Sequence, residues 1–280
     1  MVVEKAHLII ESFNLMGYDA LGVGDDDLTL GKDFLVEISK KASFPFLSAN
    51  IFDESSGKVL FQPYLLKEID GLRIGIFSLL SPDFFLGQGD PRRKGVIIRS
   101  PVEIAQNMVK ELQPKTDLII LLSHLGYPKD MELAQTVSGI HFIVGSHTGI
   151  NLPNPPVINN KTIILQMAPK GMYAGRLDLI LYNHEPIFYN TAVKRYMENN
   201  LNTLKSRLNE GKAPEAEKAQ WQRAIKEIEQ NLKQLQGKNE FTNMIFPLSE
   251  QMKDDPDIGK MAEPYRSKFL EPIKPQSPKH

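Results

Sequence analysis

Two histidines and a run of three aspartates follow apolar segments that are typical of buried strands. His124 comes directly after DLIILLS, His147 comes directly after HFIVGS, and Asp25, Asp26 and Asp27 follow YDALGVG. A strand end that opens into a glycine-containing loop is the usual ligand position in layered α/β folds. Imidazole and carboxylate groups together suit Mn, Fe, Co or Zn, and carboxylates alone favour Mg or Ca. The spacing therefore predicts a metal site built from three strand ends.

Each of these residues also has a simpler interpretation. A single histidine after a strand is more often a hydrogen-bonded loop residue than a metal ligand. The aspartates can cap the helix predicted after them, where negative charge is favourable beside the helix dipole. Three strand ends that all carry potential ligands nevertheless favour the metal site. The remaining histidines have no such context: His7, His141, His184 and His280.

Composition excludes several classes of function. The chain has 280 residues, with 33 basic and 34 acidic side chains and a net charge of −1, so it offers no broad basic field for nucleic acid. It has no cysteine, which excludes disulfides, thiolate metal sites and cysteine nucleophiles. No apolar run approaches the roughly 18 residues of a membrane span, and MVVEKAHLII lacks the pattern of a secretory signal. We therefore predict no nucleic-acid partner and no membrane partner.

The elements that must position the candidate ligands alternate between strands and helices up to about residue 145. The continuous apolar runs DLIILLS and HFIVGS are typical of central strands that are covered on both faces. Asp70-Gly71, between two β-rich runs, predicts a hairpin. Consecutive strands follow up to residue 194. This order predicts an α/β fold, a layered β-sandwich flanked by helices.

Composition changes after Lys194. Apolar residues recur at heptad spacing from Met197 to Leu208 and again from Trp221 to Leu235, which predicts a C-terminal helical hairpin. This hairpin is either a docking arm or a brace over the domain, and the brace is favoured because single-stripe helices usually cover their own core. We thus divide the chain into a domain at 1–194 and a hairpin with a C-terminal extension at 195–280. Its end, EPIKPQSPKH, is typical of a linker or tail.

Five segments together resemble the 5′-nucleotidase branch of the calcineurin-like metallophosphoesterases. In order and spacing they are NLMGYDALGVGDDDLTLG, FPFLSANI, DLIILLSHLG, GIHFIVGSHTG and GMYAGRLDLIL, and they cover residues 5 to about 182. The resemblance implies the calcineurin-like metallophosphoesterase fold, two divalent ions, an activated water and in-line attack on phosphorus. It also implies a small phosphate ester as substrate and a periplasmic or exported location, although this chain shows no signal peptide.

The chain keeps part of that family's metal motifs. Asp25 stands at the position of a metal-binding asparagine, His124 in a single-histidine block, and His147 at the first histidine of a Gly-His-x-His block. Asp26 replaces the family's catalytic histidine, and Gly149 replaces the last histidine. The Asp-x-His and Gly-Asp blocks are missing, so we expect a domain without its first strand, through truncation or through loss. The resemblance thus implies one divalent ion (Mn, Zn, Co, Fe or Mg) rather than two, held by Asp25, His124 and His147.

Two functions from different classes follow. The first is a metal-dependent phosphate-ester hydrolase with impaired activity, because an aspartate carboxylate at position 26 repels phosphate instead of donating a proton. The second is a non-catalytic binding or scaffold module that keeps the fold and uses residues 195–236 for a protein partner. The surviving histidines favour the first function, and the lost ligands favour the second.

Overall fold

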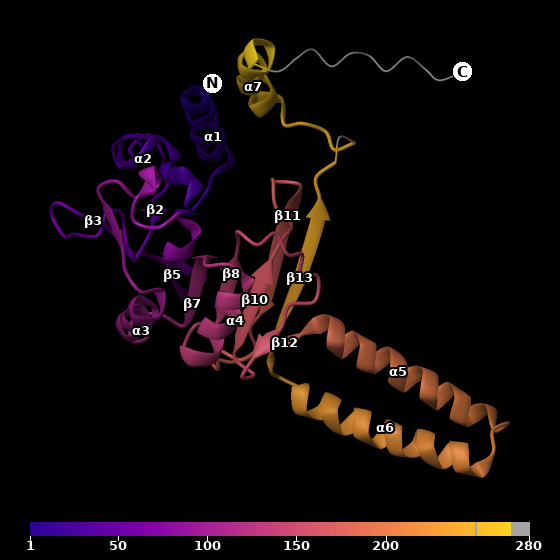
Figure 1. Cartoon of the computed structure of the whole chain (residues 1–280). Coiled ribbons are helices and arrows are strands. Elements are labelled where there is room, and N and C mark those ends of the chain that lie inside the picture. Colours follow the sequence, from indigo (N-terminus) through magenta and orange to yellow (C-terminus); the bar gives the residue numbers. More distant parts are fainter. Residues whose placement is uncertain (250, 270–280) are drawn as a thin grey trace, which may run out of the picture.

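A computed structural model describes residues 1–249 and 251–269 of the chain (Figure 1). Its main sheet has six strands in the order β4-β5-β7-β8-β10-β9. They are β4 (Tyr64–Ile69), β5 (Leu72–Leu80), β7 (Leu118–His124), β8 (Phe142–Gly145), β9 (Val157–Ile158) and β10 (Thr162–Gln166). The four inner strands run parallel, and β4 and β9 are antiparallel edge strands. The two apolar runs DLIILLS and HFIVGS form the central β7 and β8, as predicted.

The hairpin predicted at Asp70-Gly71 joins β4 to β5, with Ile69 opposite Leu72. Asp70 and Gly71 have φ values of 51° and 81°. A two-residue hairpin turn of this kind needs positive φ at both central positions, which aspartate tolerates and glycine adopts without strain. The sequence therefore sets the register of this edge of the sheet.

A second sheet packs on one face of the main sheet. It has three strands in the order β11-β13-β12, namely β11 (Tyr173–Ile180), β12 (Phe188–Asn190) and β13 (Asn239–Pro247). Leu118 and Phe142 of the main sheet share an apolar cluster with Phe188 and Phe241 of the smaller one. Two sheets joined through such a core form a sandwich, so the predicted layered architecture is confirmed.

Helices cover the other face of the main sheet. Side chains alternate between faces along a strand, so Leu118 faces the second sheet whereas Ile119 faces the helical layer. There it packs with buried residues of α3 (Pro101–Leu112) and α4 (Tyr127–Thr136), such as Ala105 and Leu133. This double cover explains why β7 is apolar at nearly every position.

The N-terminal part of the chain forms a third apolar cluster beside the main sheet. Its elements are α1 (Val2–Met16), β1 (Leu21–Gly22), the short 3-10 helix η1 (Asp26–Leu30), α2 (Lys32–Ser39), β2 (Phe46–Leu47), β3 (Ile51–Asp53) and β6 (Val96–Ile98). Strands β1 and β2 pair in parallel. Two further 3-10 turns, η2 (Pro82–Phe84) and η3 (Pro91–Arg93), lie in the loop between β5 and β6. That loop borders the candidate site described below.

The predicted helical hairpin is present as α5 (Thr191–Glu210) and α6 (Glu215–Leu235). The brace interpretation is wrong, because neither helix has a buried residue and the pair projects away from the sheets (Figure 1). The apolar stripes are only half-buried, since each helix is covered by the other. The hairpin is therefore an arm whose base alone meets β12 and β13.

The chain returns from this arm to the body as β13, a strand that the sequence did not predict. It pairs with β11 from Glu240 to Pro247 and also joins β12. Helix α7 (Pro256–Phe269) then packs beside α1, where Lys268 Nζ lies 2.5 Å from Glu4 Oε1. A division at residue 194 stays a prediction about folding units, and the whole of EPIKPQSPKH lies outside the described residues. Among the described residues, none of the helices is long and apolar enough to cross a membrane.

If the arm does not brace the domain, shortening it leaves the domain's stability unchanged. Replacing residues 201–232 by a short glycine-serine linker is expected to keep the melting temperature within about 2 °C, because exposed changes usually cost less than about 0.5 kcal/mol. The measurement is thermal unfolding followed by circular dichroism. Phe241→Ala serves as a positive control, because Phe241 is 0% exposed and its truncation costs about 3–5 kcal/mol. A fall in melting temperature as large as that of the Phe241→Ala control would show that the arm does brace the domain.

Candidate metal centre

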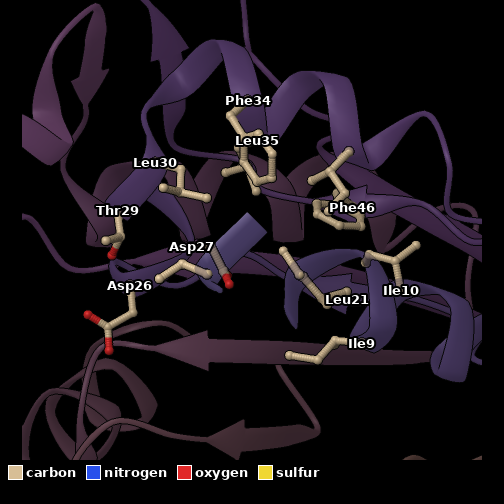
Figure 2. A pocket seen from close by; sticks show the side chains of 13 residues that line it. Ile9, Ile10, Leu21, Asp26, Asp27, Thr29, Leu30, Phe34, Leu35 and Phe46 are labelled. Atoms are coloured by element: carbon tan, nitrogen blue, oxygen red, sulfur yellow. The ribbon is translucent and has the colours of Figure 1, made fainter. Parts of the chain in front are cut away.

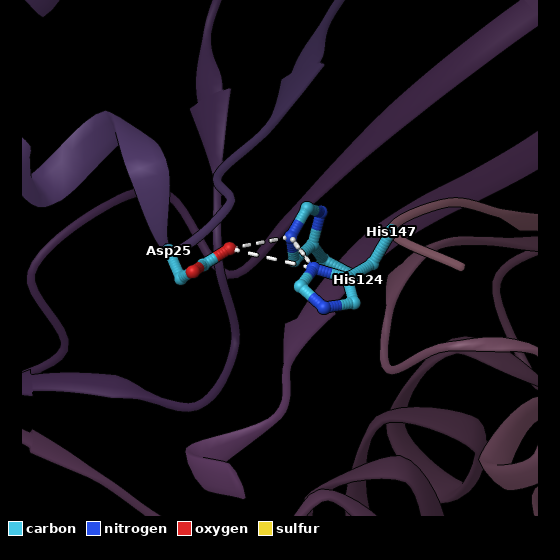
Figure 3. A group of neighbouring side chains, drawn as sticks. All are labelled: Asp25, His124 and His147. Atoms are coloured by element: carbon cyan, nitrogen blue, oxygen red, sulfur yellow. Dashed lines mark hydrogen bonds and ion pairs between the residues drawn. The ribbon is translucent and has the colours of Figure 1, made fainter. Parts of the chain in front are cut away.

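The structure brings the three predicted ligands together at neighbouring strand ends (Figure 3). Asp25 follows β1, His124 ends β7, and His147 lies two residues beyond β8. Each offers one ligand atom, and the three atoms lie within 4.8 Å of one another. This convergence follows from the parallel pairing of β7 with β8, which places the carboxyl ends of both strands on one edge.

The separations between these atoms suit a shared cation. Nε2 of His124 lies 2.8 Å from Oδ1 of Asp25 and 3.2 Å from Nδ1 of His147. The remaining separation, from Nδ1 of His147 to Oδ1 of Asp25, is 3.6 Å. Ligand atoms that share an ion at bond lengths of about 2.0–2.2 Å lie roughly 3–4 Å apart. The group needs only a small expansion to reach that range.

Ser146 determines which nitrogen of His124 faces the group. Oγ of Ser146 donates to the backbone carbonyl of Ser123 at 2.7 Å. The same Oγ of Ser146 lies 2.9 Å from Nδ1 of His124. Because that hydroxyl proton is already used, the assignment that fits is Nδ1–H of His124 donating to Ser146. In neutral His124 this leaves the lone pair of Nε2 aimed at Asp25 and His147. A ligand histidine normally has its second ring nitrogen fixed in this way.

The three adjacent aspartates have three different environments. Asp25 is buried and points towards the histidines, whereas the side chain of Asp26 is 95% exposed. Oδ2 of Asp27 accepts a hydrogen bond from the backbone N–H of Gly24 at 2.8 Å. Asp25 stands at the N-cap of η1 but accepts no capping hydrogen bond with its side chain. The capping interpretation therefore does not explain the residue that was predicted as a ligand.

Close packing fixes the two histidine rings. A Cβ atom on Gly24 would lie 2.9 Å from Cε1 of His124, so only glycine lets the aspartate loop approach this ring. His147 has a φ of 72° and stacks on the ring of Phe84, which also meets His124 edge-on. Burial, and then the proximity of His124, lower the pKa of His147. A lowered pKa favours the neutral imidazole that binds metals.

Arg92 is the site residue that sequence reasoning missed. Its Nη1 lies 2.6 Å from Oδ2 of Asp25 and 3.4 Å from Oδ1 of Asp26. Asp90 and Asp25 hold the pKa of Arg92 above its usual value, so the guanidinium stays charged. The available signal was local: in GDPRR, Asp90 precedes a proline and accepts from the backbone N–H of Arg92, which indicates a capped turn. Nothing in that turn indicated that it borders the aspartate loop.

A small apolar pocket of about 150 Å³ lies beside the aspartate loop (Figure 2). Asp26 and Asp27 line its edge, and the rest of the lining is mostly apolar, including Leu21, Phe34 and Phe46. None of the three candidate ligands lines this pocket. It is therefore a separate feature of the N-terminal cluster.

The sheet sandwich, the flanking helices and the Asp/His/His group at the strand ends form the arrangement that the resemblance to metallophosphoesterases led us to expect. No protein-family model matches the chain. The trifunctional nucleotide phosphoesterase YfkN of Bacillus subtilis is 30% identical, over 61% of this chain and 14% of that protein. A 5′-nucleotidase of Vibrio cholerae is 31% identical, over 65% of this chain and 38% of its own length. The chain thus spans well under half the length of these two relatives.

Solved structures of phosphoesterases resemble this chain as well. A 5′-nucleotidase precursor from Thermus thermophilus has a TM-score of 0.58 at 28% identity, covering 65% of this chain and 39% of the other. The calcineurin-like phosphoesterase YfkN of Bacillus subtilis has a TM-score of 0.63 at 17% identity, covering 95% of this chain and 75% of the other. The second likeness concerns the fold alone, and it extends to nearly the whole chain. The matched part of this chain resembles the 5′-nucleotidase branch of the calcineurin-like metallophosphoesterases, as its motifs predicted.

Proposed function

We propose that this chain is a 5′-nucleotidase-like metallophosphoesterase that holds one divalent ion and hydrolyses phosphate esters only weakly. The observation that carries the proposal is the convergence of Asp25, His124 and His147 at the strand ends. The names of the relatives supply the reaction class and point to a small phosphate ester as the substrate. From the family relation we also propose a periplasmic or exported location.

The ligand set fits such an ion chemically. One carboxylate oxygen and two imidazole nitrogens suit Zn, Mn, Co or Fe better than Mg or Ca. Nδ1–H of His124 is engaged by Ser146, so Nε2 of His124 can offer its lone pair to an ion, and Asp25 Oδ1 and His147 Nδ1 are the two neighbouring ligand atoms. When bound, a divalent ion supplies Lewis acidity to a phosphoryl group. The residues of the chain hold that ion and orient it.

Two substitutions support one ion and weak hydrolysis. Gly149 has a φ of 68°, and a Cβ atom there would lie 3.0 Å from the ring of Pro169. A histidine at this position is therefore strained as well as absent. Asp26 presents an exposed carboxylate where the family has a histidine that stabilises phosphoryl charge. Loss of such a donor costs about 10²- to 10³-fold in rate.

A second candidate function is a non-catalytic module that binds a partner through its arm. The observation that favours it is the projection of α5 and α6 from the body without any buried residue (Figure 1). In this proposal residues 1–194 keep the metallophosphoesterase-like fold, and residues 195–236 contact a protein. The two candidates differ in whether the metal group supports turnover.

We expect negligible hydrolysis of nucleoside monophosphates and of aryl phosphates by residues 1–280 with any divalent ion. The reason is that Asp26 and Gly149, which stand where the family has histidines, both act against the same phosphoryl transition state. The measurement is phosphate release by the purified chain with manganese, cobalt or zinc. The control is a His124→Ala, His147→Ala variant under the same conditions.

Robust turnover by the parent that disappears in this variant would show that hydrolysis is intact. Equal background rates in both would support the impaired or non-catalytic state. The double change Asp26→His, Gly149→His is expected to restore nothing, because a histidine at position 149 would be strained.

A further inference from the structure

The guanidinium of Arg92 is held in place by several contacts. Its Nε and Nη2 lie 3.1 Å and 2.9 Å from the two carboxylate oxygens of Asp90, and Nη2 also donates to the carbonyl of Phe84 at 2.8 Å. The Asp90 side chain is only 3% exposed. The face of the guanidinium lies 5.0 Å from the centre of the Phe85 ring. A bidentate pair of this kind fixes both the position and the plane of the guanidinium.

This arrangement leaves Nη1 of Arg92 to meet the aspartate loop. Asp25 then divides its two oxygens: Oδ2 lies 2.6 Å from Nη1, and Oδ1 lies 2.8 Å from Nε2 of His124. Oδ2 of Asp25 thus contacts the guanidinium, and Oδ1 of Asp25 faces the two histidines. Asp25 can therefore serve a metal through one oxygen only.

The guanidinium also occupies the place that a second cation would need. Three carboxylates, those of Asp25, Asp26 and Asp90, lie within 3.4 Å of Arg92 nitrogens. Without a positive charge among them they would form an oxygen-rich group of the kind that binds Mn²⁺ or Mg²⁺. Two positive charges cannot share Oδ2 of Asp25 at hydrogen-bond distance without strong repulsion.

We propose that Arg92 is the built-in second cation of this centre: it positions Asp25 for one metal ion and excludes another. The inference rests on the proposed single-ion function and explains how the ion number is set by this chain's own residues. Arg92 acts through Asp25 and is a positioning residue.

The test counts bound ions. Mn²⁺ bound per chain is measured by electron paramagnetic resonance, and Zn²⁺ affinity by titration calorimetry, for the full chain. The parent is expected to bind one ion.

Arg92→Met, which removes the charge at similar length, is expected to bind two Mn²⁺ ions. Arg92→Lys keeps a charge but not the planar fork, so it is expected to bind one ion about 10-fold more weakly, the scale at which loss of a ligand's supporting group acts. Arg93→Met is the matched control, because the neighbouring Arg93 contacts the same Phe85 ring, and it is expected to match the parent.

The outcomes separate this inference from the proposed function. If the parent and both Arg92 variants bind one ion equally well, the role of Arg92 is refuted and the single-ion site stands. If the parent binds none while Arg92→Met binds one, the proposed function and the positioning role of Arg92 both fail, and only the exclusion of a cation by Arg92 stands. If no protein binds an ion, both fail. Should Arg92→Met not fold because Asp90 is left buried and unpaired, Arg92→Lys decides: unchanged Zn²⁺ affinity would overturn the inference.

Discussion

Replacing His124 and His147 together by alanine is expected to weaken divalent-ion binding by about 10³-fold or more. Changing a group that only supports a metal ligand costs about 10- to 100-fold in affinity, and this variant removes two of three ligands. The remaining ligand, Asp25, keeps its contact with Arg92 and offers a single oxygen. A lone carboxylate oxygen beside a guanidinium has little affinity for any divalent ion.

The measurement is titration calorimetry with Zn²⁺, together with the visible spectrum of bound Co²⁺, which reports the coordinating atoms. His184→Ala is the matched control, since His184 is an exposed histidine elsewhere on the surface. The single variants His124→Ala and His147→Ala should each lie between the parent and the double variant. If the double variant binds Zn²⁺ as tightly as the parent, these residues do not form a metal centre.

The sequence predicted the candidate ligands because their signal is local. His124 and His147 each follow an apolar run that is typical of a central strand, and parallel strands bring their carboxyl ends to one edge. The aspartate run 25–27 was predicted in the same way, from its place after a short buried strand, and the resemblance to the family's metal-binding asparagine then singled out Asp25. The geometry of the group thus followed from periodicity and the strand ends, without any distance being known.

The rest of the site depends on contacts between distant segments. Arg92 reaches Asp25 across 67 positions in the chain, and nothing in GDPRR indicates which loop it meets. Strand β13 was missed for a similar reason. It begins with Asn239 and Glu240, which read as a polar loop but are buried: Asn239 bonds the backbone at 182 and 183, and Glu240 pairs with Lys194. Polar residues of this kind become strand residues only through tertiary partners.

Asp130 was missed because a carboxylate on an amphipathic helix is normally assigned to the solvated face. In the structure it is 0% exposed beneath β7. Its Oδ1 accepts from the hydroxyl of Ser123, whereas its Oδ2 and Oε1 of Gln166 are buried without a partner. Both unpaired oxygens face the same point: a Cβ atom on Gly145 would lie 2.5 Å from the first and 3.4 Å from the second. A protonated Asp130 would remove the cost of a buried negative charge beside a second unpartnered acceptor.

Burial raises the pKa of Asp130 to about 7, which makes the free energy of unfolding depend on pH. The folded chain holds a proton on Asp130 that the unfolded chain, with a pKa near 3.8, releases. The associated stability is therefore fully present below about pH 4 and is lost as the pH rises to about 7. At roughly 1.4 kcal/mol for each pH unit, the loss is up to about 4 kcal/mol.

His141 acts in the opposite sense over part of this range. Burial lowers its pKa to about 4, and its Nδ1 accepts from the backbone N–H of Ile119. The folded state therefore holds neutral His141, and stability from this residue is lost as the pH falls from about 6.5 to about 4. In the parent the two contributions oppose each other between pH 4 and pH 6.5, so the parent's profile alone does not reveal Asp130.

The difference between Asp130→Asn and the parent isolates the carboxyl, because His141 is common to both. The amide is neutral at every pH, can accept from Ser123 and can donate to Gln166. We expect similar unfolding free energies near pH 4 and a gap that widens in favour of the variant by a few kcal/mol up to pH 7, then stays constant. Urea unfolding at half-unit pH steps measures it, and Glu132→Gln, an exposed change on the same helix, should run parallel to the parent. A gap that stays flat from pH 4 to pH 8 would mean that Asp130 is ionised in the folded chain, and that Gln166 and Ser123 meet a buried charge instead of a proton.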